Sequence, residues 1–216
     1  MSHVTFGDIG FAVIILTILV KFILFPLSRK SIRSQLAMKK LEPLLKQIKK
    51  DYPNKEEQAK KTFELYKEHK VNPFSGLVVV LIQIPVIFAL YYTFYKGLYF
   101  TTDNLYTFVS LPLNIHTMFL GLIDVHGKSI VLALLAGLTQ FLQARLMMPK
   151  KEVVPGEVPT FAEQMQASMA TNMKYVLPVI ITLIAYKISA AVALYWVTSN
   201  IFTILQELYV RKNINK

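Results

Sequence analysis

The sequence predicts an all-α, polytopic membrane protein with five transmembrane helices and a cytoplasmic antiparallel helical hairpin. Hydrophobic residues make up 54% of the 216 residues, and yet the formal net charge is +11. The mean hydropathy is +0.43. The apolar residues gather in blocks with the charged residues between them, whereas a soluble domain alternates the two kinds along each element. Apolar blocks of about 20 residues have the length that crosses a bilayer.

The first predicted span is Ile9–Leu27, within an N-terminal segment of residues 1–27, and it contains a lysine. Burying the Lys21 ammonium in hydrocarbon costs on the order of 3 kcal/mol, so a chain that keeps such a charge usually gives it water or a partner. Thr17 lies one helical turn earlier on the same face. The two residues predict a hydrated, positively charged site within the membrane. The alternative is that Lys21, about 9 Å along the helix from Leu27, reaches the cytoplasmic headgroups with its long side chain.

Residues 28–73 predict a charged helical hairpin between the first two spans. Apolar residues recur at helical spacings over Ser31–Lys50, and Pro43 is expected to kink that helix or to mark an early turn. Asp51–Asn54 is a turn signal, and Lys55–Lys70 predicts a second charged helix. Two functions remain open for this hairpin, a solvated spacer or a device that contacts substrate or ribosome.

The rest of the chain alternates apolar spans with loops. The segment 98–128 mixes aromatic, polar and proline residues, so we expect it to lie at the external membrane surface rather than to cross. The fourth apolar run, Tyr175–Ile188, is short, which predicts local bilayer thinning or a partly covered helix. The predicted order is a second span at 74–97, the external segment at 98–128, a third span at 129–149, a cytoplasmic loop at 150–172, fourth and fifth spans within 173–210, and a tail at 211–216.

The basic residues predict the orientation in the membrane. Residues 28–72 hold thirteen of the 24 lysines and arginines. In all, twenty basic residues lie on one side of the predicted spans and three on the other, with Lys21 left inside. Positively charged loops stay in the cytoplasm, so the helical hairpin and the C-terminus are expected there. Five spans then place the N-terminus outside.

Several function classes are disfavoured by the composition. The chain has no cysteine, which excludes disulfides and thiolate metal sites. It also has no nucleotide loop, metal cluster or nucleophile–base set, so we expect no enzyme activity, cofactor or metal. The lysines flank apolar spans, where lipid headgroups explain them better than nucleic acid does. A small ion or solute transporter is the alternative class, but such carriers place carboxylates within the membrane, and here Asp8, Asp124 and Glu207 lie at edges.

Five stretches of the chain carry motifs of a known family: Glu64–Val71, Asn72–Gly76, Leu81–Tyr91, Phe119–Leu122 and Ala193–Asn200 with Gln206. They resemble the core of the YidC-type membrane protein insertases, the YidC/Oxa/Alb family. The resemblance covers nearly the whole chain in order, and the two longest motifs are specific.

The resemblance implies five helices around a hydrophilic groove that opens to the cytoplasm and to lipid and is closed toward the outside. It implies a non-enzymatic insertase and chaperone of the bacterial inner membrane that inserts and folds nascent membrane proteins. The Sec translocon and the ribosome are further partners that it leaves open. In that family the groove carries a basic residue, usually arginine, and Lys21 occupies the matching place. Lysine keeps the charge and loses the planar, bidentate fork.

The candidate groove residues are polar or amphipathic side chains in the predicted spans. Trp196, Asn200 and Thr203 are spaced by four and three residues, so they share one helical face. For the amides, interhelical hydrogen bonding is the alternative role, and for Trp196 it is a place in the aromatic belt at the membrane interface. The full set is Thr17, Lys21, Gln83, Gln140, Gln143, Thr182, Tyr186, Trp196, Ser199, Asn200 and Thr203.

Overall fold

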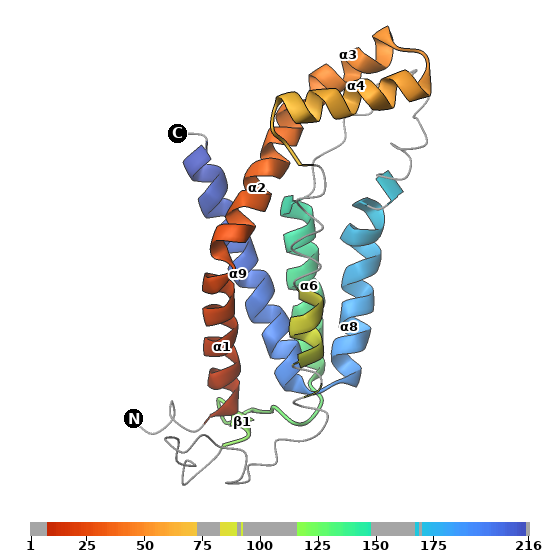
Figure 1. Ribbon diagram of the computed structural model, residues 1–216. Coiled ribbons are helices and arrows are strands. Elements are labelled where there is room, and N and C mark those ends of the chain that lie inside the picture. The colour runs from red at the N-terminus through yellow and green to blue at the C-terminus, as the bar shows by residue number, and fades with distance from the viewer. Residues whose placement is uncertain are drawn as a thin grey trace. The chain divides into compact units, whose positions relative to one another are not determined.

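The computed structural model describes residues 8–72, 83–89, 92, 116–147, 167–168 and 170–214. Most of these residues are helical, as predicted (Figure 1). Most of the second predicted span and most of the predicted 150–172 loop lie outside the described residues, although residues 83–89 are helical. The chain divides into two compact units, Met1–Phe22 with Ile87–Leu205 and Ile23–Val86 with Gln206–Lys216.

The first unit is built mainly of helices. Its α1 ends at Ile23, earlier than the predicted span, because Leu24 separates it from the next helix. The π-helical turn η2 leads directly into α8, so the short fourth apolar run is extended at its start. The helical elements are α1 (Ile9–Ile23), α6 (Ile130–Met147), η2 (Asn172–Val176), α8 (Leu177–Lys187) and the first part of α9 (Ala190–Ile214).

Helices α6 and α8 approach closely because a glycine of one faces a threonine of the other. A Cβ on Gly137 would overlap Oγ1 of Thr182 and would lie 3.0 Å from the carbonyl oxygen of Pro178. Thr182 Oγ1 donates a hydrogen bond to that same carbonyl at 2.9 Å, so its polarity is satisfied inside α8. Small residues allow such close backbone packing between helices in membranes.

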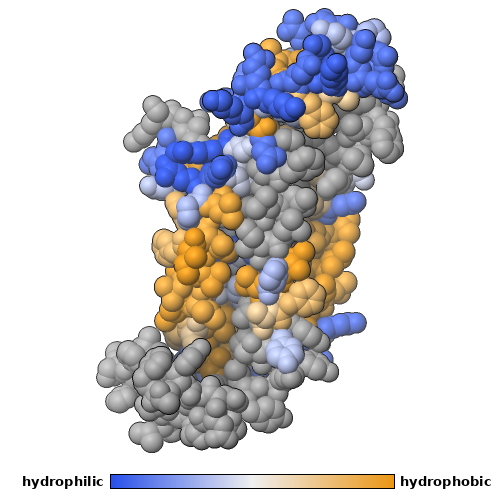
Figure 2. Space-filling view, viewed as in Figure 1, coloured by the Kyte–Doolittle hydropathy of each residue, from blue (hydrophilic) through white to orange (hydrophobic). Residues whose placement is uncertain are grey.

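The outward faces of α6 and α8 are apolar. Leu134, Leu138, Val179 and Leu183 are each more than half exposed, and Figure 2 shows apolar surface along the helices. Apolar patches of this extent indicate contact with lipid or another apolar partner. Among the described helices, α6 is long and apolar enough to cross a membrane, and α1 together with α2 passes the same test as a bent pair. The number of five spans stays a prediction.

A short β-hairpin lies in the predicted external segment, where the sequence predicts no strand. Strand β1 (Met118–Phe119) pairs antiparallel with β2 (Ile123–Asp124), with Phe119 opposite Ile123. The turn between them uses left-handed backbone at Leu120 (φ 52°) and Gly121 (φ 71°), and glycine adopts this conformation without a steric penalty. We call residues 116–127 the β-hairpin segment; the earlier part of the predicted external segment, residues 98–115, lies outside the described residues.

The second unit contains the helical hairpin. The amphipathic helix predicted over Ser31–Lys50 is divided at Leu41, close to the kink or early turn that the sequence predicts at Pro43. The reason is Pro43, which lies in the first turn of the following helix, where no intrahelical N–H bond is lost. The helices of this unit are α2 (Phe25–Lys40), α3 (Glu42–Asp51), α4 (Lys55–Glu68) and the last residues of α9.

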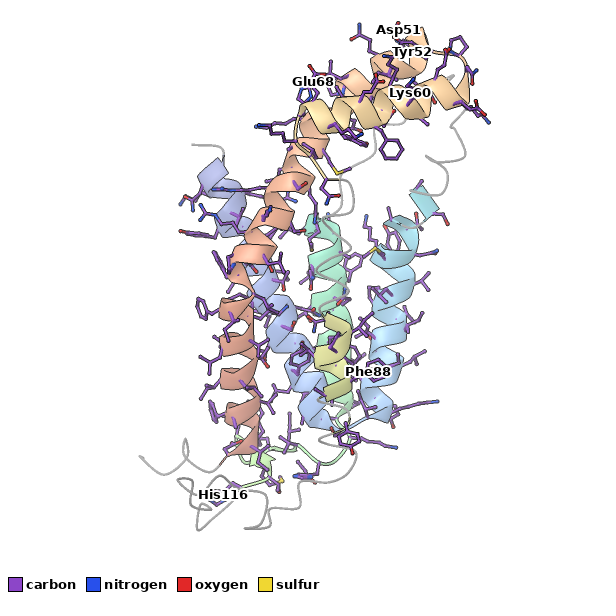
Figure 3. The ribbon with its side chains drawn as sticks, in the orientation of Figure 1. Asp51, Tyr52, Lys60, Glu68, Phe88 and His116 are labelled. Carbon is purple, nitrogen blue, oxygen red and sulfur yellow. The ribbon has the colours of Figure 1, made fainter. Side chains whose placement is uncertain are left out.

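Helices α3 and α4 run antiparallel and are joined at the predicted turn (Figure 1). The side chain of Asn54 caps α4 by accepting a hydrogen bond from the Glu56 amide at 2.9 Å, the usual role of asparagine at this position. Figure 3 shows Lys60 and Glu68 along α4 and Asp51 at the end of α3. The charged surface of this hairpin is prominent in Figure 2.

Candidate functional site

Polar side chains of α1, α6 and α9 lie inside the first unit. Thr17, Thr139, Asn200 and Thr203 have relative exposures of 3, 8, 4 and 9%, and the partly buried Lys21 joins them through Thr203. Buried hydroxyl and amide groups cost free energy unless they are hydrogen-bonded, and each of these has a partner. We call these five residues the polar cluster.

The cation of the cluster is held between α1 and α9. Lys21 Nζ donates a hydrogen bond to Thr203 Oγ1 at 3.1 Å. Thr203 Oγ1 in turn donates to the carbonyl oxygen of Ser199 at 2.8 Å. The hydroxyl proton is thus directed into α9, and the oxygen lone pairs remain for the ammonium. An ammonium has three N–H donors, so this contact leaves donor capacity for water or for an acidic group.

A second contact joins α6 to α9. The side-chain amide of Asn200 donates to Thr139 Oγ1 at 3.1 Å and to the carbonyl oxygen of Ala136 at 3.4 Å. Thr139 Oγ1 donates to the carbonyl oxygen of Leu135 at 2.8 Å. Asn200 therefore makes interhelical hydrogen bonds, the alternative role considered for it, and does so one turn from Thr203. The two contacts tie α1 and α6 to the same stretch of α9.

Thr17 extends the cluster along α1. Its Oγ1 donates to the carbonyl oxygen of Val13 at 2.6 Å, which is the way threonine hydroxyls are usually satisfied in membrane helices. With Lys21 one turn later, the inner face of α1 is polar over two successive turns. The electrostatic character of the five residues is positive, since Lys21 is the single charged member.

Other predicted groove residues of the first unit lie near the cluster along the same helices. Trp196 and Ser199 are buried on α9 at 9 and 3% exposure. Gln140 and Gln143 are partly buried on α6. The Oε1 atom of Gln143 is buried without a hydrogen-bond partner, while its Nε2 lies 3.6 Å from the sulfur of Met147.

The three remaining predicted residues, which are also outside the polar cluster, do not lie on α1, α6 or α9. Thr182 lies against Gly137 at the contact between α6 and α8. Tyr186 is 49% exposed on α8. Gln83 belongs to the second unit, where it is partly buried.

Sequence reasoning missed Thr139 of the cluster and the burial of Glu207. A single threonine in an apolar helix carries little signal, because its hydroxyl can bond to its own helix. Thr139 is four residues before Gln143, so the two share one face of α6, and this spacing could have marked Thr139 as a candidate. Glu207 in the second unit is 1% exposed, and its Oε1 accepts a hydrogen bond from Arg211 Nε at 2.8 Å; the spacing of four between opposite charges was the clue there.

The fold and the polar cluster define a helical membrane protein whose interior carries a cation. Comparison with known families gives a more specific assignment, because residues 1–216 match the family model described as 60Kd inner membrane protein. The chain belongs to this family. Membership makes it a multi-pass protein of the inner membrane.

Curated relatives support the assignment. The chain is 34% identical over 207 residues to a protein of Fusobacterium nucleatum subsp. nucleatum, covering 95% of this chain and 87% of that protein. It is 34% identical over 208 residues to one of Oceanobacillus iheyensis, covering 94% and 74%. It is 36% identical over 217 residues to one of Pelobacter propionicus, covering 97% of this chain but 36% of that longer protein. Each of the three is named membrane protein insertase YidC.

Proposed function

We propose that this protein inserts nascent membrane proteins into the inner membrane and assists their folding, with the polar cluster lining a hydrated, positively charged groove. The observation that carries the proposal is the hydrogen bond between Lys21 Nζ and Thr203 Oγ1 at 3.1 Å, which holds a cation between the inner faces of α1 and α9. The names of the relatives support the same activity.

A groove of this kind lowers the main barrier to insertion. The polar outer segment of a substrate must cross hydrocarbon, where charges and backbone groups lose their water. A cation and hydroxyl groups inside the membrane keep water along part of the path and attract acidic side chains. The apolar segment of the substrate can then move sideways into lipid.

The remaining predicted groove residues are proposed to extend the polar lining of the groove. They are Gln83, Gln140, Gln143, Thr182, Tyr186, Trp196 and Ser199.

The proposed orientation follows from the basic residues. The N-terminus lies outside, and the helical hairpin, the 150–172 loop and the C-terminus lie in the cytoplasm. The hairpin is then on the side of the membrane from which nascent chains arrive. Contact with the Sec translocon or the ribosome would belong to this side. No catalytic step is needed, because transfer is downhill once the apolar segment reaches lipid.

Transport of ions or solutes is the alternative function, and carboxylates placed along a path are its usual sign. In the described part of the chain the buried acidic residues are Asp8, at the start of α1, and Glu207, which is paired with Arg211. Within the same residues no group of three or more His, Cys, Asp or Glu could hold a metal ion. Neither finding favours a coupled carrier.

Reconstitution tests the proposal directly. Purified protein in vesicles is given a single-span substrate with an acidic N-terminal tail, and insertion is measured by protease protection. Lys21→Glu should lower insertion by roughly tenfold or more, because reversing a charge near an acidic tail replaces attraction with repulsion. Lys21→Arg should retain insertion, and Lys187→Glu, at the exposed end of α8, is the matched control. Full insertion by the Lys21→Glu protein would contradict the role of the cation.

A further inference from the structure

The β-hairpin segment forms hydrogen bonds with the first residues of α9. The first N–H groups of a helix have no partner inside the helix, and away from water each needs another acceptor. The Ala190 amide donates to the carbonyl oxygen of Gly127 at 2.8 Å, and the Ala191 amide donates to that of Val125 at 3.0 Å. Both alanines and Val125 are 0% exposed. The segment therefore takes the place of water at the start of α9.

At the start of α1, the corresponding contact is made by the side chain of Asp8. One carboxylate oxygen accepts a hydrogen bond from the Gly10 amide at 2.7 Å. The other accepts from the Leu120 amide at 3.1 Å, in the turn between β1 and β2. The Ile9 amide adds a bond to the carbonyl oxygen of His116 at 3.2 Å, and Figure 3 shows His116 at this end of α1. Asp8 is 5% exposed, so a buried carboxylate joins α1 to the segment.

Aromatic packing fits the segment against α1 at the same place. A Cβ on Gly10 would overlap the ring of Phe119, so only a glycine admits this ring. Phe119 also packs edge-to-face on Phe11, with ring centroids 5.4 Å apart and an interplanar angle of 65°. Phe119 is 9% exposed. The β-hairpin segment is thus packed and hydrogen-bonded at the ends of both helices that carry the Lys21–Thr203 contact.

We propose that Asp8 is a positioning residue that holds the β-hairpin segment across the ends of α1 and α9 and so keeps water from reaching the polar cluster from that end. Asp8 acts through the segment and does not touch substrate. The inference rests on the proposed function, because it concerns the closed end of the proposed groove. It assigns to this carboxylate, beside the backbone hydrogen bonds and the packing of Phe119, a part in the closure that makes such a groove one-sided.

Cysteine labelling tests this role. The chain contains no cysteine, so Val13→Cys supplies a unique thiol at a buried position (5% exposed) between Asp8 and Thr17. Vesicles of each orientation are treated with a membrane-impermeant maleimide. With Asp8 intact, labelling should occur only from the side of the C-terminus. In Asp8→Asn, which keeps one acceptor and loses the other, labelling from the opposite side should rise by about tenfold, the effect of losing one buried hydrogen bond. Unchanged labelling of this variant would overturn the inference.

Two further variants separate this role from general misfolding. Gly10→Ala leaves Asp8 in place but displaces Phe119, so it should open the same side to the label; a Gly10→Ala protein that labels like the parent would count against the inference. Asp124→Ala removes an exposed carboxylate of the same hairpin, which accepts from the His126 amide at 3.1 Å, and it should label like the parent. Labelling of the parent itself from both sides would contradict the one-sided groove of the proposed function. This result is distinguishable from unchanged labelling of Asp8→Asn, which would contradict only the role of Asp8.

Discussion

Thr203 on α9 determines where the Lys21 ammonium on α1 points. Its hydroxyl accepts from Lys21 Nζ at 3.1 Å while its own proton is engaged by Ser199. Phe22, the residue after Lys21, packs on Phe202, the residue before Thr203, with ring centroids 5.2 Å apart. A polar and an aromatic contact therefore fix the same two turns of helix against each other. The position of the charge is a property of the helix pair rather than of Lys21 alone.

Replacing the Thr203 hydroxyl should keep the charge of Lys21 but remove the hydrogen bond that positions it. In Thr203→Val the shape is kept and the hydrogen bond to a charged group, worth about 1.5–3 kcal/mol, is lost. Insertion of an acidic-tailed substrate should fall by roughly tenfold, and Thr203→Ser should restore it. Protease protection in reconstituted vesicles measures both. Equal activity of the valine and serine variants would show that Thr203 does not position Lys21.

The contact between Asn200 and Thr139 should be measurable as a coupling energy. Asn200→Ala and Thr139→Val each remove one partner of the 3.1 Å hydrogen bond. In a double-mutant cycle, the coupling free energy of unfolding should be about 0.6 kcal/mol, the average for hydrogen bonds between membrane helices. Unfolding in mixed detergent micelles supplies the four free energies. A cycle with Thr198 in place of Thr139 is the control, because Thr198 Oγ1 donates to the carbonyl oxygen of Leu194 within α9.

The close packing of α6 on α8 should make Gly137 intolerant of larger residues. Gly137→Ala places a methyl group onto Oγ1 of Thr182, and overpacking of this kind typically costs about 1–3 kcal/mol. Thr182→Ala removes the overlapping oxygen, so the double variant should recover part of the lost stability. Leu138→Ala, on the exposed face of the same helix, should change the thermal midpoint much less. A destabilised Gly137→Ala protein that Thr182→Ala fails to improve would point to a different cause.

The cap of α4 should govern the local stability of the helical hairpin. Asn54→Ala removes the acceptor of the Glu56 amide, which typically costs about 1 kcal/mol. Amide hydrogen exchange in the first turn of α4 should therefore be faster by about fivefold. Asn54→Asp keeps the acceptor and should exchange like the parent. Exchange in α6 should not change in either variant, because it belongs to the other unit.

The parts of this structure that sequence could predict are those marked by local pattern. Lys21 interrupts a uniform apolar run, so a partner could be expected for it. The turn between α3 and α4 and the break before Pro43 follow from residues with restricted backbone conformations. By contrast, the pairing of Lys21 with Thr203 joins residues far apart in the chain, and helical periodicity does not specify which helices meet.

Two features escaped prediction for physical reasons. Strands of two residues are too short to show an alternating pattern, so β1 and β2 left no signature in the sequence. In the sequence, Asp8 is an acidic residue at the edge of an apolar block. Its burial depends on the β-hairpin segment, whose Leu120 amide donates the second hydrogen bond to its carboxylate. In both cases the deciding contacts come from backbone groups, which every residue carries.

The π-helical turn η2 is a place where the deletion of one residue should leave the packing of α8 intact. Its Leu177 amide bonds to the carbonyl oxygen of Asn172, five residues back rather than four. Deleting one residue there would give regular α-helix, and α8 would keep its register against Gly137. A single π-turn accommodates one extra residue inside a helix, so the residues that would change their facing are those of the turn itself. The contact that the deletion would disturb is therefore the ring contact between Tyr175 and Phe141, with centroids 5.9 Å apart, while the packing of α8 survived.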